Sequence, residues 1–329
     1  MSTKLATIGS PVHRDRRACF CYNPPVPRRH LAILALISAA SLWGSAFVAT
    51  KVAVVEFQPF TLALVRFVLA SAILLPIAHY QWRRTTKRIP LPWSALALLG
   101  LFGVTLFYAS FNLGMAHTTA TKGSLIHGAI PALTALAAII VLRERPSLVN
   151  VVGIALSIGG VVVIVGIGSG DLASGTILGD ALILASALVW TAFTVLGKRI
   201  GPQIPSVVAT AYTSLFGMLF LIPFSGYEVA TANIGPVTPL GLLALAYLTL
   251  GSSAAAFFLW TFSLSHLSAS QVGVFMNFVP VTGVATAVIL LGEPLLPTQV
   301  IGGALVLLGV YFANREPAAV QRPTQVGGA

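Results

Sequence analysis

Long apolar runs alternate with short polar segments along most of the chain. Each run holds about 20 residues, which is enough for a helix to cross the hydrocarbon core of a bilayer. The breaks between the runs are rich in Pro, Gly and charged residues, as at Arg83-Arg84. The pattern predicts ten membrane-spanning segments, at about 31–50, 58–79, 94–115, 118–142, 148–168, 177–197, 205–225, 238–262, 269–291 and 297–314.

Helices are the expected structure of these segments. In lipid, every backbone N–H and C=O group needs a partner within the protein, which restricts spanning structures to helices and closed barrels. A barrel would need segments of about ten residues with alternating hydrophobicity, and such segments are absent from the sequence. We therefore expect an all-α integral membrane protein with ten transmembrane helices.

The composition agrees with lipid as the solvent. Hydrophobic residues make up 57% of the 329 residues and charged residues only 8%, whereas a soluble domain carries roughly 25% charged residues. The net charge of +11 does not point to nucleic acid, because most Lys and Arg residues lie in short segments between the apolar runs. We expect the lipid bilayer and a small-molecule substrate as partners, and no nucleic acid.

The distribution of Lys and Arg predicts the orientation. If the N-terminus is cytoplasmic, nearly all of the 19 Lys and Arg residues fall on the cytoplasmic side; Lys51 and Lys122 lie at outer ends and Arg66 within a span. We expect a multi-pass protein of the plasma (inner) membrane with both termini cytoplasmic. Residues 1–30 and 315–329 are expected to be disordered tails, the first of them basic.

The chain repeats itself at a shift of 149 residues. The matched residue types are scarce in this sequence, so their common register is unlikely to arise by chance. Five spans per half is an odd number, so the second half (177–314) enters the membrane from the side opposite to the first (31–168). This gives two inverted five-helix repeats, a plan common among secondary transporters. The matched pairs include His117 with His266, Pro131 with Pro280, Glu144 with Glu293, Gly153 with Gly302 and Gly160 with Gly309; at a shift of 147, Trp43 meets Trp190.

Each half carries short motifs. The first half has Trp43-Gly44-Ser45, Leu64-Val65-Arg66-Phe67, Pro131 and Leu142-Arg143-Glu144, and the second has Trp190, Pro280 and Leu291-Gly292-Glu293. A glycine-rich span follows the last motif of each half, whereas Arg66 has no charged counterpart in the second half. With these motifs the sequence resembles the EamA family of the drug/metabolite transporter (DMT) superfamily over residues 31–314. The resemblance implies a ten-helix inner-membrane carrier that exports amino acids, other metabolites or drugs. It also implies a central cavity lined by spans three, four, eight and nine.

Arg66 lies near the middle of the second predicted span. A charge at that depth costs roughly 2.5–3.5 kcal/mol on insertion scales and marks a functional site by default. We expect it to attract a substrate carboxylate; the alternative is a structural Arg bonded to backbone carbonyls. The sequence places no Asp or Glu deep in a predicted span to pair with it.

His127 lies near mid-depth in the fourth predicted span. It shares a helix face with Ser124 and Pro131, at positions i, i+3 and i+7. Histidine changes charge near neutral pH, which suits proton coupling. The alternative is a neutral His bonded to a neighbouring helix.

Pro131 and Pro280 occupy equivalent positions in the two halves. Each removes one helical hydrogen bond and is expected to kink its span. Such kinks are candidate hinges for alternating access, or else static features of packing. Glu144 and Glu293 stand at helix ends, where we expect interface groups, Glu144 being paired with a neighbouring Arg; a gating or proton role is the alternative.

A mixed aromatic and polar set is expected to line the cavity, although each member alone also suits ordinary packing or an interhelical bond. With Arg66 and His127, the candidate substrate-binding residues are Tyr108, Asn112, Trp260, Asn277, Trp43 and Trp190.

The preferred hypothesis is a secondary transporter that exports a small organic metabolite by alternating access, without a cofactor or metal. Cys19 and Cys21 form neither a disulfide framework nor a complete metal site. The sequence is compatible with a homodimer. The alternative is a multi-span membrane enzyme that acts on lipid-linked substrates, which would need a converging acid/base or metal cluster.

Overall fold

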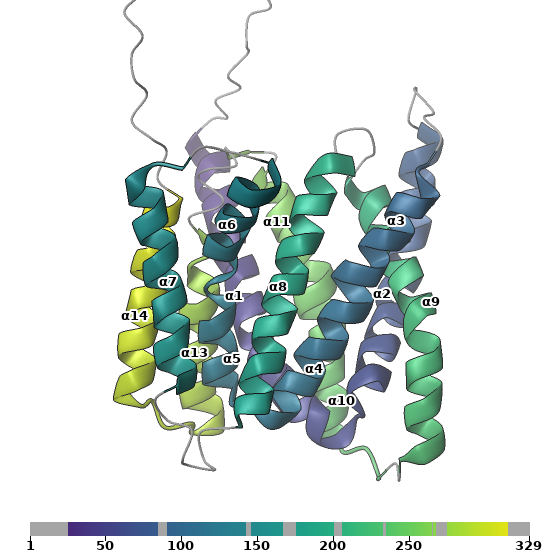
Figure 1. The fold of residues 1–329 in the computed structure, drawn as a ribbon. Coiled ribbons are helices and arrows are strands. Elements are labelled where there is room, and N and C mark those ends of the chain that lie inside the picture. The colour runs from purple at the N-terminus through teal and green to yellow at the C-terminus, as the bar shows by residue number, and fades with distance from the viewer. Residues whose placement is uncertain are drawn as a thin grey trace, which may run out of the picture.

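The computed structural model describes residues 26–84, 91–142, 146–166, 176–200, 206–232, 235–264, 266–267 and 275–314. Most of the two predicted tails, Cys19, Cys21 and Glu144 lie outside these ranges. The described chain is a bundle of upright helices without a strand (Figure 1). The elements are α1 (Val26–Glu56), α2 (Pro59–Arg84), α3 (Trp93–Gly100), η1 (Leu101–Leu106), α4 (Phe107–His117), α5 (Ala120–His127), α6 (Ile130–Leu142), α7 (Leu148–Gly166), α8 (Ile177–Ile200), α9 (Ser206–Thr231), α10 (Pro239–Ala246), η4 (Tyr247–Ala255), α11 (Ala256–Leu264), α13 (Phe278–Leu291) and α14 (Pro297–Ala313).

Eight helical stretches in the described part of the chain are long and apolar enough to cross a membrane. They coincide with the first eight predicted segments, so the prediction of a multi-pass helical membrane protein is confirmed. Two shorter apolar helices, α13 and α14, occupy the ninth and tenth predicted segments. Residues 268–274, in the first part of the ninth segment, lie outside the described residues.

Two of the spans contain a π-helical segment, which the apolar pattern did not predict. The third span runs through α3, η1 and α4, and the eighth through α10, η4 and α11. The hydroxyl of Thr105 in η1 donates to the carbonyls of Gly100 and Gly217, at 3.4 and 3.1 Å. At a shift of 149 residues, η1 falls within η4. π-Helical segments of this kind occur often at functional sites.

Charged side chains distinguish the two ends of the bundle. α1 begins and α14 ends at the end drawn uppermost in Figure 1. This end, called the basic end, carries the exposed side chains of Arg29, Arg83 and Arg84. The opposite end, called the acidic end, holds the four acidic residues of the described chain, Glu56, Asp180, Glu228 and Glu293.

α7 and α14 lie side by side and pack through glycines. A Cβ atom on Gly160 would lie 2.6 Å from the oxygen of Gly302, and one on Gly309 would lie 2.6 Å from the oxygen of Gly153. The contacts are reciprocal, because Gly153 matches Gly302 and Gly160 matches Gly309 in the sequence repeat. Small residues let membrane helices approach to backbone contact, where van der Waals packing holds them together.

A leucine at position 160 should destabilise the protein by forcing α7 from α14. Gly159 is a matched control, because a Cβ atom there meets nothing within 4 Å. We expect Gly160→Leu to lower the unfolding midpoint in detergent, as overpacking by about 1–3 kcal/mol or more would do. Gly159→Leu should stay close to the parent protein. Equal midpoints for the two variants would contradict this packing.

Candidate functional site

A cavity of about 350 Å³ lies between the two halves of the chain. On α2 its lining passes from Phe67 through Ala70 to Leu74, so the cavity runs from mid-depth toward the basic end. Its deepest residues include Tyr108 of α4 and Ser253 of η4. The aromatic lining residues are Phe67, Tyr108, Trp190, Phe193 and Phe257, and the hydroxyl-bearing ones are Thr210, Thr213, Ser214 and Ser253.

Arg66 lies at the deep end of this cavity, directly behind Ser253 and Tyr108. Its side chain is 5% exposed. Its Nε donates to the Ser253 hydroxyl at 2.8 Å, and one terminal nitrogen donates to the Ser252 hydroxyl at 3.1 Å. The guanidinium carbon stands 4.8 Å from the centre of the Tyr108 ring, a cation–π distance. Among the described residues, no carboxylate forms an ion pair with it.

Trp43 and Trp260 support η4 from outside the lining. The indole nitrogen of Trp43 donates to the carbonyl of Ser252 at 3.0 Å. Its ring packs against those of Trp260 and Phe257, with centroids 5.1 and 5.6 Å apart. These aromatic contacts fix the turn that presents the two serines to Arg66.

Three other candidate residues lie away from the cavity lining. His127 is enclosed by aromatic rings, including those of Phe47 and Phe111, and its Nε2 lies 2.7 Å from the Ser186 hydroxyl of α8. The buried amide of Asn112 donates to the carbonyl of Pro59 at 2.8 Å and so ties α4 to the start of α2. Asn277 directly precedes α13, half-buried, and makes no side-chain cap bond there.

Pro131 and Pro280 follow breaks in their spans. Residues 128 and 129 separate α5 from α6, and Pro131 is the second residue of α6. Pro280 is the third residue of α13, after a turn at residues 276 and 277. A Cβ atom on Gly128 would lie 3.3 Å from the Pro280 ring, so the two broken spans cross at their breaks.

The cavity is lined by other spans than the family resemblance implied, and this crossing explains why. The lining found here comes from spans two, three, six, seven and eight, and not from the described parts of spans four and nine. A Cβ atom on Gly283 of α13 would lie 2.5 Å from that of Ser124 of α5. Spans four and nine therefore pack directly on each other and leave no space there.

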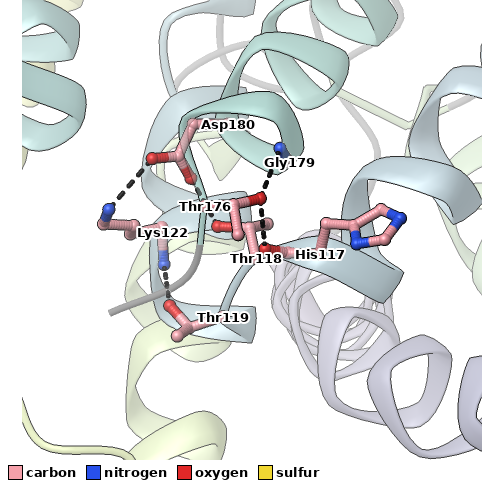
Figure 2. Close-up of polar contacts among 7 residues, drawn as sticks. All are labelled: His117, Thr118, Thr119, Lys122, Thr176, Gly179 and Asp180. Atoms are coloured by element: carbon pink, nitrogen blue, oxygen red, sulfur yellow. Dashed lines mark hydrogen bonds and ion pairs between the residues drawn. The ribbon is translucent and has the colours of Figure 1, made fainter. Parts of the chain in front are cut away.

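The acidic end contains a buried ion pair that the sequence analysis missed. Figure 2 shows Lys122, in the first turn of α5, facing Asp180, in the first turn of α8. The ammonium and one carboxylate oxygen are 2.9 Å apart, and the side chains are 1% and 0% exposed. The hydroxyl of Thr118 donates to the second carboxylate oxygen. Lys51 of α1 joins this region by donating to the carbonyl of Thr118 at 2.5 Å.

Three glutamates at the same end cap the starts of helices. Glu293 accepts from the backbone N–H groups of Ala120 and Thr121, both at 2.8 Å, at the start of α5. Glu228 does the same for residues 60 and 61 of α2, at 3.1 and 2.8 Å. Glu56 accepts from the N–H of Thr238, at the start of α10, at 2.7 Å. The first N–H groups of a helix have no partner within it, so these carboxylates satisfy donors that lipid could not.

The small number of acidic residues in the sequence could have pointed to these contacts. The chain has only eight Asp and Glu residues, and each one placed at the edge of an apolar run needs a partner. The sequence located Glu293 at a helix end and Lys122 at an outer end, but could not say which helix start or which acid each would meet.

Comparison with known proteins agrees with this fold. The sequence model of the EamA-like transporter family matches residues 30–166 and again residues 177–315. The chain belongs to the EamA-like transporter family. As a member of this family, it is a membrane transporter of small metabolites.

Named relatives and one solved structure are similar to this family member. A protein of Archaeoglobus fulgidus described as an uncharacterized transporter is 33% identical over 83% of this chain and 93% of its own length. A probable terminal-alkyne amino-acid exporter of Streptantibioticus cattleyicolor is 28% identical over 90% and 98%. A solved crystal structure of a protein matches the fold with a TM-score of 0.60 and 21% identity, over 86% of this chain and 96% of that one.

Breaking the buried ion pair should destabilise this EamA-family chain. Removing one partner leaves a buried charge unpaired, which typically costs about 3–5 kcal/mol, whereas replacing both by apolar residues is often neutral. We expect Asp180→Asn and Lys122→Met each to lower the unfolding midpoint, and the double variant Lys122→Met/Asp180→Leu to recover much of the loss. Additive losses in the double variant would contradict the pairing.

Proposed function

We propose that the chain is a secondary carrier of the plasma membrane that exports small organic solutes by alternating access. Its ten spans would form two inverted five-helix halves. The double match of the family model, at residues 30–166 and 177–315, supports this arrangement. So does the reciprocal packing of α7 and α14, because each contact pairs a residue of one half with the repeat partner of the other.

The basic end faces the cytoplasm in this proposal, because Lys and Arg accumulate on the cytoplasmic side of membrane proteins. The cavity extends toward that end from Arg66. A solute would therefore enter from the cytoplasm and reach mid-depth without crossing the acidic end. This one-sided cavity is the observation that carries the proposal.

The acidic end is held shut by bonds between the two halves. Glu56 belongs to the first half and caps α10 of the second. Glu228 and Glu293 belong to the second half and cap α2 and α5 of the first. Asp180 of the second half pairs with Lys122 of the first. A path to the outside requires these bonds to part, and a lost helix cap costs roughly 0.5–2 kcal/mol.

The crossing of the broken spans is the proposed hinge. α5 carries both the Glu293 cap at its start and the break before Pro131 at its end. Reorientation of α5 about that break, and of α13 about the break before Pro280, would release the outer bonds. The missing helical hydrogen bonds at the prolines lower the resistance to such bending.

We propose Arg66 as the group that attracts the substrate, with Tyr108 and Trp190 as cavity walls. Trp43 and Trp260 would hold η4 in place; His127, Asn112 and Asn277 would serve helix packing. The name of the S. cattleyicolor relative, a probable exporter of an amino acid, supports a substrate that carries a carboxylate. The names of the matched family and relatives give no support to a membrane enzyme.

Replacement of Arg66 should abolish efflux without preventing membrane insertion. We expect Arg66→Ala to lower export of amino-acid analogues at least tenfold, in cells or in proteoliposomes loaded with the solute, because it removes the one cation that the described residues place beside the cavity. Arg84→Ala is the matched control, since Arg84 is exposed at the basic end and stacks on Tyr80. Normal efflux by Arg66→Ala would refute this role.

Weakening the outer bonds should shift the protein toward an outward-open form. In a background without Cys19 and Cys21, we expect Glu228→Gln/Glu293→Gln to raise labelling of Ser124→Cys by an impermeant maleimide from the outside severalfold. Labelling of Thr213→Cys from the cytoplasmic side should fall in parallel. Unchanged labelling at both positions would show that these bonds do not hold the outer side closed.

A further inference from the structure

We infer that this carrier takes monoanionic carboxylic acids with an apolar body, and that Ser252 and Ser253 are the residues that position Arg66 to bind them. The inference rests on the proposed function, because it names the substrate class of the same cavity.

The guanidinium of Arg66 has donors left over for a ligand. Arginine carries five N–H donors in a planar fork. Two of its three nitrogens donate to Ser253 and Ser252, and the third makes no bond among the described residues. The two serine contacts and the Tyr108 ring hold the fork in one plane. A fixed fork with free donors suits bidentate binding of a carboxylate.

The charge of Arg66 is not neutralised by the described protein. Its partners are hydroxyl groups, which accept hydrogen bonds but carry no charge. All four carboxylates of the described chain lie at the acidic end, where they cap helices or pair with Lys122. A buried cation at mid-depth without a counter-ion is costly, so an anionic ligand would gain from supplying one.

The two π-helical segments give the cavity one polar side and one apolar side. At a shift of 149 residues, Ser252 and Ser253 of η4 correspond to Gly103 and Val104 of η1, which also line the cavity. A Cβ atom on Gly103 would lie 2.6 Å from the Phe193 ring, so the missing side chain leaves room for that ring. A solute bound here would direct its carboxylate toward η4 and its apolar part toward η1.

The lining also predicts what the cavity rejects. Its described residues include no Asp or Glu, so an ammonium group finds no counter-ion there. An α-amino group is therefore not required for binding, and organic cations are excluded. Because Arg66 is the one cation that the described residues place at this depth, a monoanion fits better than a doubly charged phosphate ester.

Direct binding to the purified full-length protein tests the substrate class. The probes are phenylacetate, phenylalanine, phenylalaninamide and phenyl phosphate, measured by isothermal titration calorimetry in detergent. We expect phenylacetate to bind, and phenylalanine to bind more weakly because its ammonium finds no counter-ion in the lining. Phenylalaninamide, which lacks the carboxylate, and phenyl phosphate, which carries a second negative charge, should bind at least about tenfold more weakly than phenylacetate. Arg66→Ala should remove the preference for phenylacetate over the amide.

A second set of variants tests the positioning role of the serines. We expect Ser253→Ala to reduce the ratio of phenylacetate affinity to phenylalaninamide affinity about tenfold. Without the serine hydroxyl, the guanidinium of Arg66 is no longer held in the orientation that binds a carboxylate. Ser253→Thr keeps the hydroxyl and should restore the ratio. Ser110→Ala is the matched control, because Ser110 lies outside the cavity lining and its hydroxyl donates to the carbonyls of Leu106 and Phe107 in its own span. A merely structural role would weaken both probes alike and leave the ratio unchanged, which would overturn the assignment.

The outcomes separate this inference from the proposed function. If phenylacetate does not bind, or if phenylalaninamide binds as tightly as phenylacetate, the substrate class is overturned. If Arg66→Ala nevertheless abolishes efflux, the carrier proposal stands. Normal efflux by Arg66→Ala would instead refute the role of Arg66 in the proposed function.

Discussion

Every polar group inside a bilayer needs a partner from the protein, and this requirement shapes both ends of the molecule. Spans that begin within the bundle leave their first N–H groups without intrahelical partners. Here carboxylates from the other half supply them, Glu293 for α5 and Glu228 for α2. The bonds that satisfy each half are thus the same bonds that join the halves at the acidic end. Stability and closure of the acidic end therefore rest on one set of interactions.

The two halves share the same residues where their helix backbones touch, and they differ in the residues beside Arg66. The glycines of α7 and α14 remain in register because a side chain at any of the four positions would collide with the partner helix. By contrast, the two serines of η4 that bond Arg66 correspond to a glycine and a valine of η1 at a shift of 149 residues. The family model matches both halves, and in the proposed arrangement the differences at these positions give the cavity its polar side.

The sequence predicted the helices well because apolar length alone decides whether a segment can cross lipid. It located Arg66 by the same logic, since a charge at that depth stands out. The hydrogen bonds of Arg66 to Ser252 and Ser253 could not be predicted. Hydroxyl groups in membrane helices commonly bond the backbone of their own helix, as the Thr249 hydroxyl does to the carbonyl of Leu245. The π-helical segments and the pairing of Lys122 with Asp180 depend on the packing of distant spans, which no local pattern encodes.

The closed acidic end has a consequence for binding from the two sides of the membrane. In the proposed orientation, a solute arriving from the cytoplasm would find the binding-competent form already populated. A solute arriving from outside would bind only the form with an open acidic end, and its apparent dissociation constant would rise by the reciprocal of the fraction of molecules in that form. The two faces of the carrier would then differ in apparent affinity although a single set of side chains binds the solute. Such an imbalance favours loading inside a cell and prompt dissociation into the dilute medium.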